Sequence, residues 1–311
     1  MNSTVSWIES TVPGSGELAE HLDFPHGGVL RMTKAREHSR ISTVLVAVFS
    51  LLSGVASAQE KKGFSYTVGP KAVISITNYY GPITVKPSGN GQVVVTTVSY
   101  SDGVSFENEQ HGNRIELRSI STRHGDGLVD YTVLVPSDAL VSLRSSDGTL
   151  HTQGLRGDVI LQAETATVEV SDISDAHLHV QTLSGPINLT DIRNSHLDVQ
   201  SVGGNVNIHN VSGSSVQVNS GRGRIKYDGD PGPAGEYQLT SHSGDLEISI
   251  PTSASVEIKS HSSNGESNEE LPKNDGALTM SSGNLFLKPR ITNASRFVLR
   301  SFKGKIHIKR P

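Results

Sequence analysis

The chain has 311 residues, enough for one large domain or two ordinary ones. Its 27 basic and 31 acidic side chains give a formal net charge of −4, which argues against nucleic acid as a partner. Cysteine is absent, and this excludes disulfides, thiolate metal ligands and cysteine nucleophiles. Only 34% of the residues are apolar and 31 are glycine, a composition that favours thin, turn-rich β structure.

The first 58 residues have the features of an export signal preceded by an extension. Met32 begins a basic stretch, residues 41–55 are apolar and almost uncharged, and Ala56-Ser57-Ala58 forms an A-x-A cleavage sequence. We therefore expect residues 32–58 to be a signal peptide and residues 1–31 to be an upstream extension, not the native start. The mature protein would be periplasmic, in the cell envelope or extracellular. In the alternative, residues 41–58 remain as one N-terminal transmembrane anchor, since about 18 apolar residues can span a bilayer.

Residues 59–136 alternate apolar and polar side chains between Gly, Asn and Asp turns, which predicts strands. Ile74 and Ile76 are followed nine residues later by Ile83 and Val85, and later segments of this region are less regular. We expect an irregular β N-terminal cap here, because the open end of a repeating β structure needs cover against pairing with other chains.

Residues 137–311 contain one pattern that returns every 19 residues in its clearest part. Each repeat has two apolar pairs, and each pair alternates with polar neighbours, as in a strand with one buried face. The pattern predicts an all-β fold, a parallel β-solenoid (β-helix) with two short strands per rung of about 19–21 residues. The first pairs are Val159/Leu161, Leu178/Val180, Leu197/Val199 and Val216/Val218, and the second pairs are Val168/Val170, Ile187/Leu189, Val206/Ile208 and Ile225/Tyr227.

One segment interrupts this array. Lys259–Gly276 has almost no apolar residue where a partner strand should lie, so we expect a loop insertion over residues 259–276.

Glycine recurs at one corner of each rung, in the phrase small-x-x-Gly-x-apolar. A tight corner between two strands favours φ > 0, which glycine adopts without steric cost, so these are expected structural turn residues. They are Gly148, Gly185, Gly204, Gly223, Gly244, Gly283 and Gly304. At the second corner, Asp175, Asn194 and Gly213 keep register and also tolerate the left-handed region.

Equivalent residues of successive rungs should stack in columns about 4.8 Å apart. One apolar column fills the second corner: Leu155, Ile173, Ile192 and Val211. One outer column consists of amides that could hydrogen-bond in a ladder: Gln162, Gln181, Gln200 and Asn219.

The run "VDYTVLVPSDALVSLRSSDGTLHTQGLRGDVIL", followed by repeated Ser-Gly-x-Ile phrases, resembles the bacterial putative-adhesin family. This domain of unknown function is related to the head GIN domain adhesins. The resemblance covers about Phe64 to Ile308 and implies an exported β-solenoid. It implies no catalytic residues, since the family offers none to transfer.

Two groups of residues could carry chemistry. His177, His179, His196 and Asp198 should meet on one outer face, where imidazole and carboxylate could bind a divalent transition metal; a tolerated polar face is the alternative and the expected one. Asp172, Asp191 and Asn210 also stack, and paired acids can hydrolyse glycosides or bind calcium. Their place directly after a strand favours a structural Asx-type corner instead.

The sequence thus predicts an exported, non-catalytic, adhesin-like binding or structural module without a cofactor. Its partner would be a protein, a surface or a polysaccharide, and a membrane only if residues 41–58 stay uncleaved. The alternative is a carbohydrate-active enzyme, a polysaccharide lyase or hydrolase, because β-helices host such enzymes. Short rungs and few aromatic residues favour the binding module.

Overall fold

The computed structural model describes residues 59–89, 91–101, 103–121, 127–263, 267–270, 278–281 and 293–311. The expected signal peptide and upstream extension lie outside these residues. Within the described part, the chain forms two twelve-stranded sheets. No helix there is long and apolar enough to cross a membrane.

Sheet A contains, in spatial order, β1 (Glu60–Thr67), β4 (Gln92–Ser99), β7 (Val129–Pro136), β3 (Ile83–Ser88), β9 (Thr149–Gln153), β11 (Thr167–Ser174), β13 (Ile187–Arg193), β15 (Val206–Val211), β17 (Ile225–Asp228), β19 (Leu246–Ser249), β24 (Ile306–Lys309) and β21 (Ser267–Glu270). Sheet B contains β22 (Leu278–Ser281), β20 (Val256–Ser262), β23 (Ser295–Ser301), β18 (Glu236–Ser241), β16 (Ser215–Ser220), β14 (His196–Ser201), β12 (His177–Thr182), β10 (Val159–Ala163), β8 (Leu140–Asp147), β2 (Val73–Tyr80), β6 (Arg114–Ser121) and β5 (Val104–His111).

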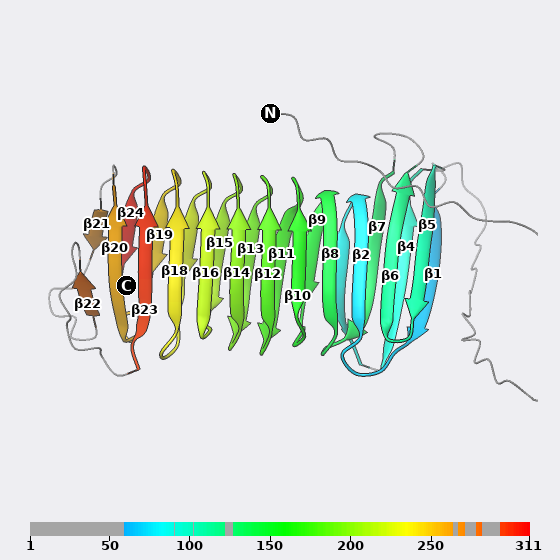
Figure 1. The fold of residues 1–311 in the computed structure, drawn as a ribbon, viewed down its shortest axis with the longest axis horizontal. Coiled ribbons are helices and arrows are strands. Elements are labelled where there is room, and N and C mark those ends of the chain that lie inside the picture. Colours follow the sequence, from blue (N-terminus) through cyan, green and yellow to red (C-terminus); the bar gives the residue numbers. More distant parts are fainter. Residues whose placement is uncertain are drawn as a thin grey trace, which may run out of the picture. The chain divides into compact units, whose positions relative to one another are not determined.

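The central strands confirm the predicted parallel β-solenoid. The chain alternates between the sheets, so that one strand of sheet B and the following strand of sheet A make one rung (Figure 1). The register of β12 against β10 and β14 joins residues 19 apart, as the repeat predicts: Leu178 pairs with Val159 and with Leu197. Each strand places every second side chain between the sheets, because successive residues point to opposite faces.

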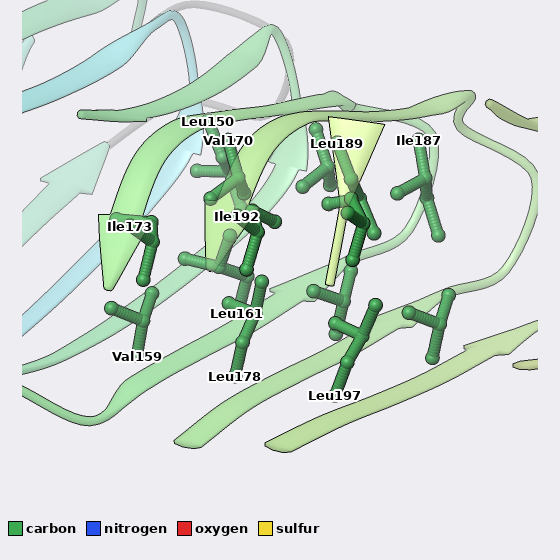
Figure 2. Close-up of a cluster of buried hydrophobic side chains, with 14 of the residues drawn as sticks. Leu150, Val159, Leu161, Val170, Ile173, Leu178, Ile187, Leu189, Ile192 and Leu197 are labelled. Atoms are coloured by element: carbon green, nitrogen blue, oxygen red, sulfur yellow. The ribbon is translucent and has the colours of Figure 1, made fainter. Parts of the chain in front are cut away.

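The core consists of the predicted apolar columns. Figure 2 shows side chains of both sheets, Leu161 and Leu178 from one and Val170 and Leu189 from the other, pointing toward one another. These side chains are almost completely buried. Each contributes about 1.5–3 kcal/mol to folding by leaving water. The predicted corner column is buried as well: Leu155, Ile173, Ile192 and Val211.

Aromatic rings replace the aliphatic stack near the C-terminal rungs. Tyr237 stacks on Phe297 with ring centroids 4.4 Å apart, and Tyr227 meets both rings edge to face. The Tyr237 hydroxyl donates to the Pro231 carbonyl at 2.7 Å and accepts from the Gly213 amide. Burial raises the pKa of Tyr237 to about 12. The longer turn around Pro231 therefore supplies the polar partner that a buried tyrosine needs.

The turn glycines are explained by a different cause from the one that the sequence suggested. Gly148 has φ = 120°, as expected, but the other corner glycines that the structure describes do not have a positive φ. A β-carbon on Gly204 would instead lie 1.9 Å from the carbonyl oxygen of Gly185 on the preceding rung. The same approach recurs, at 1.9–2.1 Å, for Gly185, Gly223, Gly244 and Gly304. Glycine is needed because the backbones of adjacent corners touch; Gly283 lies outside the described residues.

The N-terminal cap is β structure, as predicted, and it is partly antiparallel. β4 pairs antiparallel with β1 and β7, and β5 pairs antiparallel with β6. The rung formed by β2 and β3 lies between the β6/β7 rung and the β8/β9 rung, although it precedes both in the chain. Buried Asn78 on β2 donates to the Val129 carbonyl at 2.8 Å and accepts from Ser119 at 2.6 Å. Val129 is on β7 and Ser119 is on β6, so Asn78 ties the first rung to its outer neighbour, the β6/β7 rung.

The C-terminal end repeats this arrangement. The last rung, β23 and β24, lies between the β18/β19 rung and the earlier strands β20 and β21. Buried Ser295 donates to the Gly232 carbonyl at 2.6 Å, and Arg310 donates to the carbonyls of Thr252 and Ala254. Among the described strands, neither the β2/β3 rung nor the β23/β24 rung lies at the edge of the two sheets.

The expected loop over residues 259–276 needs correction. Lys259–Ser262 belong to β20, and Ser267–Glu270 form β21, which pairs with β24 in parallel. The partner strand that seemed missing is present without apolar residues, since backbone hydrogen bonds to a neighbouring strand do not depend on side chains. Residues 264–266 and 271–276 lie outside the described part.

Candidate binding groove

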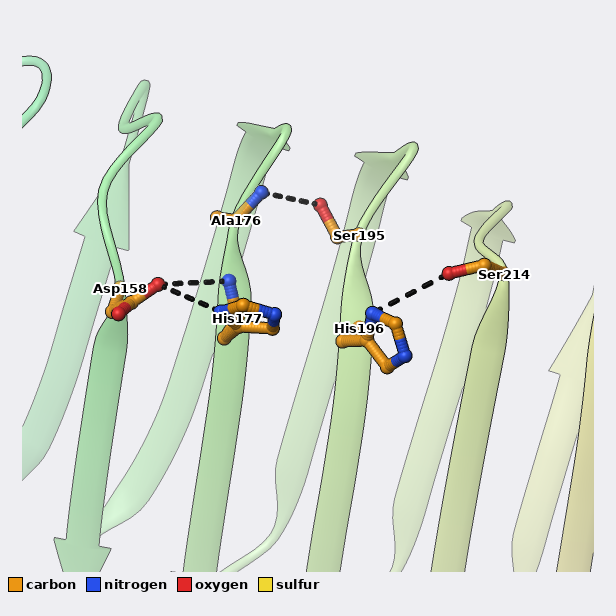
Figure 3. Close-up of polar contacts among 6 residues, drawn as sticks. All are labelled: Asp158, Ala176, His177, Ser195, His196 and Ser214. Carbon is orange, nitrogen blue, oxygen red and sulfur yellow. Dashed lines mark hydrogen bonds and ion pairs between the residues drawn. The ribbon is translucent and has the colours of Figure 1, made fainter.

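The four residues of the predicted metal patch lie on one face, but they do not converge. His177 Nδ1 is 3.1 Å from Asp158 Oδ1, and His179 Nδ1 is 3.1 Å from Asp198 Oδ2. Figure 3 shows His177 turned toward Asp158, while His196 contacts Ser214 on the next rung. The rings of His177 and His196 are 5.3 Å apart. Among the described residues, no three histidine or acidic side chains are arranged to hold a metal ion.

This face is therefore a row of pairs between neighbouring rungs. On this face His177 and His179 each use Nδ1 for the carboxylate partner; the His177–Asp158 pair is exposed, and the side chains of His179 and Asp198 are 35% and 41% exposed. Exposed pairs of this kind contribute about 0–1 kcal/mol each. The arrangement matches a polar outer face better than a ligand set.

The stacked acids at the second corner are structural. Asp172, Asp191 and Asn210 have φ of 55°, 54° and 53°, the left-handed conformation expected for an Asx-type corner. The Asn210 side-chain amide donates to Asp191 Oδ1 one rung away. Asp175 and Asn194 repeat this geometry, with φ of 54° and 50° and an amide-to-carboxylate hydrogen bond. The carboxylates of Asp191 and Asp175 hold the corner together, because each accepts a hydrogen bond from the next rung.

A hollow of about 930 Å³ runs along the other corner, where the strands of sheet B end. It crosses the rungs of β8, β10, β12, β14 and β16. A smaller hollow of about 310 Å³ shares Asn219 and Ser220 with it and continues over β18, β23 and β20. We call the two hollows together the corner groove.

One wall of the corner groove is the predicted amide column. Gln162, Gln181, Gln200 and Asn219 pair in register across four parallel strands. Arg144 lies at one end of this wall, and Thr240 and Arg300 continue it at the other. Gln181 Nε2 donates to Gln200 Oε1 at 3.4 Å, so part of the ladder forms.

The opposite wall is a ridge of corner residues two positions further along each rung. It carries Glu164, Leu183, Val202, Gly221, His242 and Phe302. Leu183, Val202 and Phe302 are 55%, 50% and 45% exposed, so the ridge presents apolar surface to solvent at three of its positions. The Phe302 ring stacks on His242 with centroids 5.1 Å apart and planes 11° from parallel.

The floor between the two walls is closed by hydroxyl residues that serve the fold. Ser201 Oγ donates to the Gly204 carbonyl at 2.8 Å, and Ser220 Oγ donates to the Gly223 carbonyl at 2.9 Å. Ser241 Oγ accepts from the Gly244 amide at 2.9 Å. These hydroxyls are buried and hydrogen-bonded to the backbone of the turn. A ligand in the groove would therefore contact the side chains of the two walls.

Sequence reasoning identified the amide column but missed the groove. The missing signal is the residue two positions after each amide, in the phrases "TLSG", "SVGG" and "SFKG". Leucine, valine or phenylalanine stands there in a turn, where a polar residue is the usual choice. An apolar residue repeated at an exposed turn position was the available evidence for a second wall.

Comparison with known proteins identifies a family but no curated relative. A family model described as Toastrack DUF4097 matches residues 72–285. No curated protein matches. Two solved structures are similar at 12% identity: a putative adhesin from Bacteroides fragilis NCTC 9343, with a TM-score of 0.42, and a putative cell adhesion protein from Clostridium sporogenes ATCC 15579, with a TM-score of 0.21. They cover 82% and 81% of this chain, respectively, and 100% of their own.

Proposed function

We propose that this chain, which belongs to the Toastrack DUF4097 family, is an exported, non-catalytic scaffold that binds an extended partner along the corner groove. The observation that carries the proposal is the amide wall of the groove, where an equivalent side chain recurs from rung to rung. A regular row of equivalent side chains suits a partner that is itself extended and repetitive.

The placement of the acidic side chains supports binding without turnover. Hydrolysis of a glycosidic bond needs two carboxyl groups facing each other across a substrate. The stacked acids Asp172 and Asp191 lie at the other corner of the rung, in left-handed turns. Glu164 is the one carboxylate among the residues that line the larger hollow.

Export is supported by the N-terminal sequence. A basic stretch, an apolar stretch and an A-x-A sequence follow one another over residues 32–58. An exported scaffold without cysteine can fold independently of the oxidising or reducing character of its compartment.

The experiment that tests this function is a binding screen with product detection. The purified protein is applied to arrays of polysaccharides and cell-envelope components, and the soluble phase is examined for released oligosaccharides. We expect retention on an extended polymer and no product. Release of oligosaccharides that is lost in Asp172→Asn or Asp191→Asn would establish a carbohydrate-active enzyme instead.

A further inference from the structure

We infer that the ligand of the corner groove is an uncharged glycan chain that lies along the groove, parallel to the stack of rungs. This inference rests on the proposed binding function and adds the chemical class and the residues that recognise it. Three properties carry it: an amide wall, an exposed apolar and aromatic ridge, and the absence of charge in the middle of the groove.

The amide wall matches the hydroxyl groups of a sugar chain. A carboxamide offers two donor hydrogens and a carbonyl acceptor, so it can bind a hydroxyl in either direction. Gln181 and Gln200 use only part of this capacity in their mutual hydrogen bond. Successive amides stand about 4.8 Å apart, one on each rung, and they present the same groups repeatedly to a chain with regularly spaced hydroxyls.

The ridge matches the apolar faces of sugar rings. Leu183 and Val202 give an aliphatic edge in the middle of the groove, and Phe302 gives a flat aromatic surface toward its C-terminal part. His242 stacks against Phe302 and holds the orientation of the ring. Ligand sites typically combine such apolar surface with a few polar groups that fix orientation.

The charge distribution selects an uncharged chain. Between Arg144 and Arg300, the amide wall carries no charged side chain on β10, β12, β14, β16 or β18. A polyuronate would place carboxylates along the amide wall, where these five strands offer no cation to pair with them, which is unfavourable in a partly desolvated groove. Glu164 on the ridge would repel such a chain further.

The backbone of the groove argues against an extended peptide. A peptide that adds to a sheet needs unpaired backbone groups at a strand edge. At the ridge, the amides of Leu183, Val202 and Gly221 already donate to the carbonyls of Ala163, Thr182 and Ser201. The groove therefore offers side chains and no free edge.

The test measures binding of fluorescently labelled oligosaccharides by anisotropy with the full-length protein. The probes are a β-1,4-linked gluco-oligosaccharide, a chitin oligosaccharide and an oligogalacturonate. We expect saturable binding of at least one uncharged probe and none of the oligogalacturonate. The double variant Gln181→Ala/Gln200→Ala and the single variant Phe302→Ala should each weaken binding by about tenfold or more, as loss of one or two ligand contacts implies.

A matched control is available on the opposite sheet. Asn188 and Asn207 also pair in register, and Asn207 Nδ2 donates to Asn188 Oδ1 at 2.9 Å, but they lie on the outer face of sheet A. Asn188→Ala/Asn207→Ala should leave binding unchanged, and thermal melts will verify that all variants fold. Equal loss of binding in the control, or binding of the oligogalacturonate alone, would overturn the inference and leave the scaffold function standing. Cleavage of a probe would overturn the scaffold function itself.

Discussion

Gly204 lies so close to Gly185 on the preceding rung that a β-carbon on Gly204 would stand 1.9 Å from the Gly185 carbonyl oxygen. No real β-carbon tolerates that distance, so any side chain at position 204 must push two corners apart. Gly203, its neighbour in the chain, has 3.5 Å of clearance to the nearest backbone atom. Two adjacent glycines thus have opposite tolerance to substitution.

We therefore predict that Gly204→Ala lowers the free energy of unfolding by about 3 kcal/mol or more, because the clash involves backbone that cannot move aside. Gly203→Ala is the matched control and should change it by less than about 1 kcal/mol. Urea unfolding of both variants measures the difference. Similar stability of the two would refute close backbone approach as the reason for glycine at this corner.

The cost of a substitution in a strand should likewise depend on whether the side chain points between the sheets or away from them. Ile187→Asp or Val199→Asp places a charge among buried aliphatic groups and should abolish cooperative folding. His177→Ala and Asp198→Ala remove members of exposed pairs and should cost about 1 kcal/mol or less. Thermal melts followed by circular dichroism compare the two sets, and equal melting temperatures would contradict the assignment of faces.

The aromatic segment of the core predicts loss of stability at alkaline pH. The pKa of Tyr237 is raised from 10.0 to about 12 in the folded protein, so above pH 10 the unfolded chain loses this proton while the folded chain keeps it. Stability is fully present below pH 10 and falls as pH rises toward 12, by about 1.4 kcal/mol per pH unit for such a tyrosine. Tyr66, with a pKa raised to about 12, acts in the same direction.

Urea unfolding between pH 9 and 11.5 measures this slope. Tyr237→Phe should be less stable at pH 8, because the Pro231 carbonyl and the Gly213 amide lose their partner, and should show a shallower alkaline decline. A decline of equal slope in the variant would exclude Tyr237 as its source.

Asn78, on the interleaved first rung, should make a large contribution to the stability of the N-terminal cap. Asn78→Ala leaves the Val129 carbonyl and the Ser119 hydroxyl without their buried partner, so it should lower the free energy of unfolding by about 1–3 kcal/mol for each unsatisfied group. Amide hydrogen exchange should show faster exchange in β2, β6 and β7 and little change in β14. Uniformly faster exchange would mean that Asn78 stabilises the whole stack and not the cap.

Export predicts a defined N-terminus. Expression of the full chain in a bacterial host, followed by fractionation and N-terminal sequencing, should give a mature protein that begins at Gln59, after the A-x-A sequence. An uncleaved chain in the membrane fraction would favour the anchor alternative, and an uncleaved cytoplasmic chain would contradict export.

The sequence predicts the middle of this fold well, because two independent periods coincide there. Alternation at period two gives the buried face of β12 and β14, and the 19-residue repeat gives their register. In the strands near both ends of the stack, only the alternation at period two remains. Alternation alone would allow Ile258 to pair with Leu299, but it pairs with Phe297, and this shift of two residues keeps every side chain on its face. Alternation cannot distinguish these registers, nor can it place β23 beside β18 ahead of β20.

The groove escaped prediction for another reason. Its wall of amides follows from register, but its depth depends on how far Leu183 and Val202 project from a turn, and strand periodicity does not describe turns. The left-handed conformation of Asp172 and Asp191 was predictable, because short polar side chains tolerate it, although both residues lie within β11 and β13 and not after a strand.

The interleaving of both terminal rungs has a consequence for how proteins of this kind change in length. The β2/β3 and β23/β24 rungs each lie between two other rungs, and contacts such as those of Asn78 and Ser295, which fix them there, lie outside the regular 19-residue units. Duplication of one unit between β12 and β16 would add a rung without altering either closure. It would also lengthen the corner groove by one amide and one ridge residue. Gene duplication in the middle of the chain could thus adjust the length of polymer that is bound, while both ends keep the same structure.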